Sequence, residues 1–253
     1  MRRHTGIVAL AVAPLGLLGC GGAGAGASAD GDAMAADSAT PASAAMSSDT
    51  AWITLFDGTD LSAWRGYHRS DVPTGWQVRD GLLVLIPGSD GGDLITRDEY
   101  GDFELALDWR VAPGGNSGIF YRASEDPEVI WYGAPELQLL DNAGHPDGGN
   151  TLTSAGAAYD LYPPTADVAK PGGEWNATRI VGRGPHVEHW LNGTKIVEYE
   201  AWSQDWNARV AASKFAEYPG FGEARSGHIG VQDHGDTVWF RDIRVRTLPP
   251  GDH

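Results

Sequence analysis

The sequence has a single cysteine, Cys20, among its 253 residues. Because there is no second cysteine, no disulfide can form within the chain, and core packing must stabilise the fold even in an oxidising compartment. The region after residue 20 contains no thiol and no G-x-S-x-G segment. These two absences argue against catalysis by a cysteine or serine nucleophile.

The specific metal-binding motifs are also missing. The sequence contains no HExxH segment, no CxxC pair and no EF-hand loop. Carboxylates, histidines and amides remain, and these groups can hold Ca²⁺ or Mn²⁺. A divalent cation, Ca²⁺ or Mn²⁺, is therefore the one possible cofactor that these residue types indicate.

Basic side chains are scarce relative to acidic ones. The chain has 18 lysines and arginines against 34 aspartates and glutamates, and its formal net charge at pH 7 is −16. A surface of this sign repels nucleic acid and the headgroups of anionic lipids. We therefore expect no nucleic-acid partner, and we expect a ligand that is neutral, cationic or both.

The N-terminus begins with Arg2 and Arg3 and continues with an apolar segment, residues 7–18, that is too short to cross a bilayer. This arrangement predicts a secretory signal peptide over residues 1–19. Residues 20–50 consist mainly of Ala, Gly, Ser and Asp, which predicts a flexible linker. The remaining residues, 51–253, are enough for one all-β domain with its own core.

The segment LLGC at residues 17–20 resembles the lipobox of bacterial lipoproteins, in which the cysteine is lipidated and becomes the mature N-terminus. This resemblance implies a lipid anchor at Cys20; an ordinary signal peptide with an incidental cysteine is the alternative. Gly21 follows, and under the sorting rule of enterobacterial lipoproteins a residue other than aspartate implies the outer membrane. The implied location is exported and lipid-anchored, on the periplasmic or the surface face.

The clearest strand signal lies at residues 103–111, where Phe103, Leu105 and Leu107 alternate with polar or small residues. A period of two with one apolar face predicts a half-buried strand. The Asn192-Gly193 pair between two strand-like runs is the strongest short signal for a hairpin. Further strands are expected within residues 75–86, 117–123, 135–141, 175–199, 226–232 and 237–248.

Long amphipathic helical windows are absent, although residues 212–222 could hold one helical turn. Many short strands with dense Gly and Pro turns predict an all-β fold, a two-sheet jelly-roll sandwich. An immunoglobulin-like sandwich is the alternative, but it is usually shorter. In a jelly roll one sheet curves, and every second residue of its strands lines a groove.

The alternation rule points to a candidate site on two strands. In GHIGVQDH, with Ile229 and Val231 inward, Gln232 faces the groove, and Asp233 and His234 fall at the strand end. In PELQLLDNAGH the same rule leaves Glu136 and Gln138 outward, with Asp141 and His145 in the following loop. Two strands would thus each present an amide and leave a carboxylate and a histidine at the rim, which is the convergence that a site needs.

Other polar residues in apolar surroundings are candidates for ligand binding: Asn116 before a strand, Arg122 at its end, and Tyr159. Each has a structural alternative, since loop histidines and aspartates often stabilise turns. His189 shares the parity of core residues and could be a hydrogen-bonded core histidine. The ten tryptophans could stack on sugar rings, but a sandwich core also needs large side chains.

Six segments resemble the bacterial 3-keto-disaccharide hydrolase domain, a family long known only as a domain of unknown function. They are NSGIFYR, PELQLLDNAGHPD, AAYDLYPP, GEWNATRIVGRGPHVEHWLNGTKIVEYE, SKFAEYPGFG and GHIGVQDHGDTVWFRDIRV. The opening ITLFDGTDLSAWRG is similar as well. The resemblance spans residues 52–248 and implies a concanavalin A-like jelly roll, in agreement with the strand pattern.

The resemblance implies an enzyme that acts on glycosides oxidised at C3 of the sugar, by elimination followed by hydration. A ketone at C3 acidifies the C2 proton, so one base, one acid and one group that stabilises negative charge suffice. We expect His145 or His234 to be the base, oriented by Asp141 or Glu136. Hydroxyl groups or the enediolate would be held by Gln138, Gln232, Arg122, Tyr159, Asn116 and Asp233, or by a divalent cation.

Two other functions stay open. An ordinary glycoside hydrolase on a jelly roll would need two carboxylates, and on the strand with Glu136 the second outward position is an amide, Gln138. A non-catalytic carbohydrate-binding lipoprotein is the second, since fold does not fix function. The sequence leaves open the sugar, the leaving group and the oligomeric state.

Overall fold

The computed structural model describes residues 51–250. The predicted signal peptide, Cys20 and the linker lie outside the described residues, as do residues 251–253. Among the residues that are described, no helix combines the length and the apolar character that a membrane span requires.

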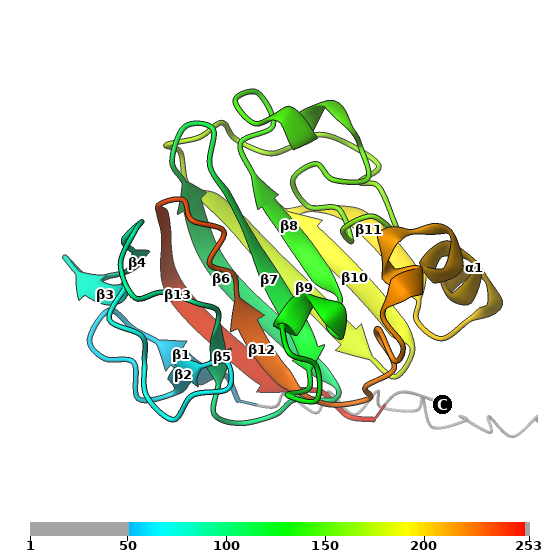
Figure 1. Cartoon of the computed structure of the whole chain (residues 1–253), viewed down its shortest axis with the longest axis horizontal. Coiled ribbons are helices and arrows are strands. Elements are labelled where there is room, and N and C mark those ends of the chain that lie inside the picture. Colours follow the sequence, from blue (N-terminus) through cyan, green and yellow to red (C-terminus); the bar gives the residue numbers. More distant parts are fainter. Residues whose placement is uncertain (1–50, 251–253) are drawn as a thin grey trace, which may run out of the picture. The chain divides into compact units, whose positions relative to one another are not determined.

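The described chain folds into two antiparallel β-sheets that pack face to face, with β7, β8 and β12 in front of the larger sheet in Figure 1. The larger sheet has eight strands in the order β11-β10-β9-β6-β13-β4-β3, with β1 paired to β13. The smaller sheet has five strands in the order β2-β5-β12-β7-β8. The predicted all-β jelly-roll sandwich is therefore confirmed.

The strands of the larger sheet are β1 (Ile53–Phe56), β3 (Trp76–Arg79), β4 (Leu82–Leu85), β6 (Phe103–Val111), β9 (Asn176–Arg183), β10 (His186–Leu191), β11 (Thr194–Glu200) and β13 (Val238–Thr247). Those of the smaller sheet are β2 (Trp64–Gly66), β5 (Leu94–Thr96), β7 (Asn116–Ala123), β8 (Glu136–Leu140) and β12 (His228–Val231).

Every predicted strand segment contains strands of the structure, and the predicted hairpin joins β10 to β11. Asn192 and Gly193 both have positive φ, 49° and 82°, as a two-residue hairpin turn requires. Strands β1, β2 and β5 were not predicted. They have only three or four residues each, too few to establish an alternating pattern.

The core lies between the sheets and is built from alternate residues of the strands. Leu105 and Trp109 face inward from the larger sheet, and Ile119 and Leu137 face inward from the smaller one. His189 belongs to this core, fully buried, with its ring nitrogens 2.9 Å from the hydroxyl of Tyr121 and 3.0 Å from the carbonyl of Gly156. Burial lowers the pKa of His189 to about 4, so this histidine is a neutral core residue.

Helical structure in the described chain is short. The helix α1 (Gln204–Ala212) is capped by Ser203, whose hydroxyl accepts from the backbone N–H of Trp206. It was not predicted, because Trp206 is its one buried residue and nine residues carry little periodic signal. The 3₁₀ turns are η1 (Ile130–Tyr132), η2 (Pro146–Gly149) and η3 (Lys214–Glu217), the last within the segment expected to hold a helical turn.

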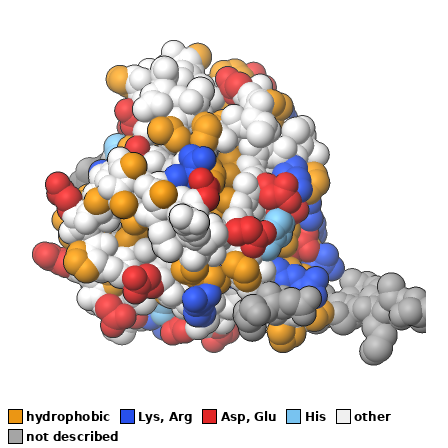
Figure 2. Space-filling view, turned by 90° about the vertical axis from the view of Figure 1, so that its right-hand side faces the viewer, with side chains coloured by type: hydrophobic (Ala, Val, Ile, Leu, Met, Phe, Trp, Pro, Cys, Tyr) orange, Lys and Arg blue, Asp and Glu red, His pale blue; other side chains and the backbone are white. Residues whose placement is uncertain are grey.

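The tryptophans are used in two main ways. Trp64, Trp109 and Trp206 are buried in the core. Trp175 and Trp239 instead each pack on the guanidinium of Arg110, with ring centres 4.9 and 4.3 Å from its Cζ. On the face of the molecule in Figure 2, acidic and basic side chains lie close together, with hydrophobic side chains between them.

The outer face of the smaller sheet is partly covered by η1. Ile95, Phe120 and Ala123 of the sheet pack there against Ile130 and Ala134, and they form a small second hydrophobic cluster. The rest of this face, over β7, β8 and the end of β12, is open to the cavity in which the candidate site lies.

Candidate functional site

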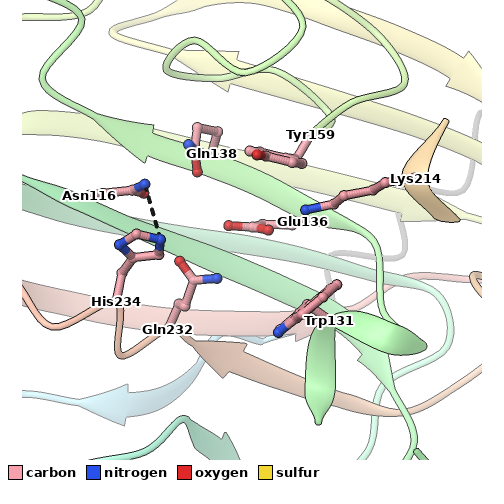
Figure 3. A pocket seen from close by; sticks show the side chains of 8 residues that line it. All are labelled: Asn116, Trp131, Glu136, Gln138, Tyr159, Lys214, Gln232 and His234. Atoms are coloured by element: carbon pink, nitrogen blue, oxygen red, sulfur yellow. Dashed lines mark hydrogen bonds between the residues drawn. The ribbon is translucent and has the colours of Figure 1, made fainter. Parts of the chain in front are cut away.

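A cavity of about 210 Å³ lies on the outer face of the smaller sheet, beside η1 (Figure 3). Typical pockets for drug-sized ligands measure about 300–1,000 Å³, so this one suits a group of about the size of one sugar ring. Its lining comes from β7, β8, the end of β12, η1, η3 and the loop after β8. The lining residues are Asn116, Trp131, Glu136, Gln138, Tyr159, Lys214, Gln232 and His234.

Strand alternation places the two β8 residues in the cavity. Leu137 and Leu139 belong to the main core, and Glu136 and Gln138 point to the opposite side, as predicted. The same rule holds at the end of β12, where Val231 is in the core and the next residue, Gln232, lines the cavity. Six of the ten residues predicted from the sequence as catalytic or substrate-binding therefore line one cavity.

Gly118 on β7 makes room for the side chain of Glu136. A Cβ atom at Gly118 would lie 2.7 Å from Cδ of Glu136 and closer still to Oε1. Since real Cβ atoms do not approach other atoms so closely, the carboxyl group of Glu136 occupies space that only a glycine leaves free.

The carboxyl group of Glu136 is held in an environment that disfavours its charge. Burial raises its pKa to about 8, with a small further increase from Asp93 and a partial offset from the positive charge of Lys214. At neutral pH the group is therefore mostly protonated and can donate a proton.

Three amide side chains in the cavity have buried polar atoms without a hydrogen-bond partner among the described residues. These atoms are Oδ1 of Asn116, both Oε1 and Nε2 of Gln138, and Oε1 of Gln232. Gln138 is 1% exposed and Asn116 is 3% exposed. Leaving buried polar atoms unpaired costs about 1–3 kcal/mol each, so a site with this many is built to receive a polar ligand.

His234 lies beside these amides at the rim of the cavity. Its Nε2 is 3.5 Å from Nδ2 of Asn116, which can donate only to an unprotonated nitrogen (Figure 3). The loop before it is fixed by Asp233, whose carboxylate accepts from the backbone N–H of Gly92 (2.7 Å) and of Gly235 (2.9 Å). The N–H of Asp233 in turn donates to Asp93 (2.9 Å). Asp233 thus positions His234 and does not itself line the cavity.

His145 and Asp141 lie next to the cavity without lining it. The ring of His145 is 6.4 Å from that of His234, and its Nδ1 accepts from the backbone N–H of Asp147. The carboxylate of Asp141 accepts from the N–H groups of Gly114 (2.8 Å) and Ala143 (3.3 Å), and these bonds lower its pKa. Asp141 therefore stabilises the loop that carries His145 and makes no contact with either imidazole.

Arg122 differs from the expectation, because a β-bulge turns it away. Between the pairs His228–Ala123 and Gly230–Phe120, β7 has one residue more than β12. Arg122, with φ of 53°, directs its guanidinium to the carbonyls of Gly101 (3.1 Å) and Gly184 (2.8 Å). It does not line the cavity.

Two cavity residues were not identified from the sequence, Trp131 on η1 and Lys214 on η3. Both lie on single 3₁₀ turns that follow no strand or helix periodicity. The only signals available were an aromatic residue and a lysine next to glycine- and proline-rich segments, and neither is specific.

Among the described residues that line the cavity, Glu136 and His234 are the only carboxyl group and imidazole, and the amide oxygens of Asn116, Gln138 and Gln232 are further possible metal ligands. In residues 51–250 a group of three His and Glu side chains close enough to share an ion is His186, Glu188 and Glu198. These lie on β10 and β11 of the other sheet, where Lys195 already pairs with both glutamates. A divalent cation in the cavity would be held by Glu136, His234 and these amide oxygens, and it stays a prediction.

Comparison with known sequences gives one family. The sequence profile of the 3-keto-alpha-glucoside-1,2-lyase-like domain matches residues 51–246. A protein of Bacteroides thetaiotaomicron named 3-keto-disaccharide hydrolase is 40% identical in an alignment of 227 positions that covers 78% of this chain and 78% of that protein.

Solved structures agree with this match. A candidate glycosyl hydrolase from Parabacteroides distasonis is 31% identical with a TM-score of 0.73, over 79% of this chain and 95% of that chain. A second one from the same organism is 30% identical with a TM-score of 0.60, over 78% of this chain and all of that chain. All of the cavity residues lie within the matched range of the family profile.

Proposed function

Because the chain belongs to the family of 3-keto-alpha-glucoside-1,2-lyase-like domains, we propose that it cleaves the glycosidic bond of 3-keto-glycosides in the cavity around Glu136. The substrate is a small carbohydrate oxidised at C3. Cleavage proceeds by removal of the C2 proton, elimination at C1 and hydration.

The observation that carries this proposal is one carboxyl group with a raised pKa among buried, unpaired amides. An ordinary glycosidase uses two carboxyl groups on either side of the bond. Among the described residues that line the cavity, Glu136 is the only carboxylate, and the next outward position on β8 is Gln138. An elimination next to a ketone needs one base and one acid, which matches this set.

His234 is the base in the proposed reaction. Its Nε2 faces Asn116 at the rim, where it can take the C2 proton of a sugar ring in the cavity. The electron pair of the C2–H bond then forms a C2=C3 bond, and the carbonyl electrons move onto the C3 oxygen. A positioned base of this kind contributes about 10²–10⁴ to the rate.

Glu136 is the acid. The enediolate collapses by re-forming the C3 carbonyl and a C1=C2 bond, while the C1–O bond breaks and the leaving oxygen receives the proton of Glu136. Water then adds its oxygen to C1 and gives a proton to the carboxylate of Glu136, while His234 returns its proton to C2, which gives the free 3-keto-sugar and restores both residues. With a pKa of about 8, Glu136 holds the required proton at neutral pH.

The remaining groups bind the ring. Asn116, Gln138 and Gln232 pair their free amide atoms with sugar hydroxyls. Trp131 packs its indole on the apolar face of the sugar. Tyr159, whose pKa burial raises to about 12, remains a hydroxyl donor.

The direct test compares 3-keto-glucosides with the same glycosides before oxidation, using the purified protein. We expect release of the free keto-sugar from the oxidised substrate alone. His234→Ala should lower kcat by about 10²–10⁴. His145→Ala should lower it less, because that ring does not line the cavity and lies 6.4 Å from the ring of His234.

Three results would contradict the proposal. Full activity in both histidine variants would remove the imidazole from the mechanism. Turnover of unoxidised glycosides would indicate an ordinary glycosidase, and sugar binding without turnover, unchanged in the variants, would indicate a carbohydrate-binding lipoprotein.

We further propose that the protein is exported and lipid-anchored at Cys20 in the outer membrane. The support is the LLGC segment and the residue that follows it, Gly21. Metabolic labelling with a fatty-acid analogue should mark the native protein and not Cys20→Ser. Equal labelling of both would exclude Cys20 as the anchor.

A further inference from the structure

Lys214 is the one lysine or arginine among the described residues that line the cavity. As the first residue of η3, it has a fixed backbone: its N–H donates to the carboxylate of Asp160 (3.1 Å), and Ser213 caps the turn at the N–H of Phe215 (3.1 Å). Phe215 is buried and stacks on Phe221, with ring centres 3.8 Å apart. The fold therefore determines where the lysine side chain begins and in which direction it extends.

The ammonium group of Lys214 lies against aromatic rings; burial lowers its pKa, and the nearby carboxyl groups of Glu136, Asp160 and Asp147 partly offset this. Its Nζ lies 4.1 Å from the ring centre of Tyr159 and 4.8 Å from that of Trp131. Within residues 51–250 it makes no hydrogen bond and no ion pair. An ammonium group has three N–H donors, and contact with aromatic faces leaves them free for a ligand. Figure 3 shows the amine directed into the cavity, toward Glu136.

A purely structural role does not account for this arrangement. An ion pair with Glu136 would need a carboxylate, but that group is mostly protonated at neutral pH. Lys214 is exposed, yet its amine lies against aromatic rings and points into the cavity. Lys195 is less exposed and instead pairs with acidic neighbours, since its Nζ lies 3.1 Å from Glu188 and 2.8 Å from Glu198.

We propose that Lys214 is a catalytic residue that binds the C3 oxygen of the keto-sugar and stabilises the negative charge that develops there. This inference rests on the proposed function. It assigns the group that stabilises negative charge, which the elimination needs in addition to the base and the acid. The amides of the cavity are neutral, whereas the ammonium group of Lys214 offers a positive charge at the exposed edge of the cavity.

The proposed role of Lys214 is limited to the steps in which the C3 oxygen carries negative charge. When His234 takes the C2 proton, the carbonyl electrons move onto the C3 oxygen next to Nζ. They return to the carbonyl when the C1–O bond breaks and the leaving oxygen takes the proton of Glu136. Lys214 therefore keeps its own proton and forms no covalent bond, and it acts only while the charge is present.

The test compares Lys214→Met, which keeps the length without charge, with Lys214→Arg, which keeps the charge. Lys170→Met, an exposed lysine outside the cavity, is the matched control. On a 3-keto-glucoside, Lys214→Met should lower kcat by about 10²–10³ with little change in KM. Lys214→Arg should recover part of this loss, and the control should match the wild type.

A second measurement separates this role from mere support of the site. With substrate deuterated at C2, the isotope effect on kcat should rise in Lys214→Met, because loss of the charge slows proton removal specifically. Thermal unfolding verifies that the variant is folded, and Lys214→Gln provides the same comparison if Lys214→Met does not fold.

Several results would overturn the inference. If the wild type turns over the keto-glucoside and Lys214→Met keeps its kcat, or changes KM alone, Lys214 has no catalytic role and the proposed function stands. A covalent adduct trapped on Lys214 by borohydride would replace charge stabilisation with an imine mechanism. A wild type without turnover of keto-glycosides would overturn the proposed function and this inference with it.

Discussion

The side chain of Glu136 on β8 occupies the space that a side chain on Gly118 of β7 would fill. The two residues lie on neighbouring strands, and the missing Cβ of one leaves room for the carboxyl group of the other. The position of the proposed acid therefore depends on a residue that has no functional group.

This relationship predicts the effect of Gly118→Ala. The added methyl group must displace the carboxyl group of Glu136, and a misplacement of about 1 Å in a catalytic group costs roughly 10²-fold in rate. We expect kcat on a 3-keto-glucoside to fall by this order. Gly149→Ala on η2 is the control, because a Cβ there meets no atom and the backbone has no positive φ. Equal kcat in the two variants would contradict the dependence.

The raised pKa of Glu136 predicts a pH profile for activity. The acid must be protonated, so kcat/KM should fall about tenfold per unit as the pH rises above about 8. Glu136→Gln should lose most activity on a 3-keto-disaccharide. It should keep much more on a 3-keto-glucoside with a nitrophenolate leaving group, which departs without a proton. An alkaline limb that remains in the variant with this substrate would belong to another group.

The same pKa predicts a pH dependence of stability. The ordinary pKa of this carboxyl is about 4.5, so between about 4.5 and 8 the folded protein holds a proton that the unfolded chain has released. The free energy of unfolding should therefore fall with rising pH in this range, by up to about 1.4 kcal/mol per unit from this group.

Urea unfolding at pH 5 and pH 8.5 measures this effect. Glu136→Gln should show a smaller loss of unfolding free energy between the two pH values than the wild type, because the amide does not titrate. Since all other titrating groups are shared, the difference between the proteins isolates Glu136. Equal losses would mean that its pKa is not raised.

The unpaired amide of Gln138 predicts that its removal weakens substrate binding without lowering the stability of the fold. In Gln138→Met the free energy of unfolding should be unchanged or higher, because buried polar atoms without partners are removed. The KM for a 3-keto-glucoside should rise about tenfold or more. Gln77→Met on β3 is the control: it loses bonds to Thr74 and Arg79 but lies outside the cavity, so stability falls and KM does not change.

A clear loss of stability in Gln138→Met would contradict this prediction, since it would show that the amide is satisfied within the fold. Unchanged KM would show instead that the amide does not bind the sugar. The two measurements therefore examine the same residue for two independent properties.

The sequence predicted the part of the site that depends on strand periodicity. Glu136, Gln138 and Gln232 follow from alternation along β8 and β12, since inward leucines and valines determine which neighbours face outward. The family match confirms the resemblance drawn from the ordered motifs. The roles of the individual residues stay predictions.

Features that break periodicity could not be predicted in this way. The bulge in β7 reverses the direction of Arg122, and bulges leave no reliable trace in a single sequence. Trp131 and Lys214 reach the cavity from isolated 3₁₀ turns, and their positions depend on how distant segments pack. Asp141 and Asp233 stabilise loops through backbone bonds, one of the alternatives that their residue type allowed.

The ammonium group in the cavity stands on η3, a turn that belongs to neither sheet. Its replacement leaves every ladder hydrogen bond of the scaffold in place, whereas the three amides that bind the sugar lie on strands or next to the end of one. The amides that bind the sugar ring and the lysine that stabilises the developing negative charge thus lie on separate segments of the chain. Redesign of the cavity for an acidic or an unoxidised sugar should therefore begin with substitutions in residues 212–222 and leave the strands unchanged.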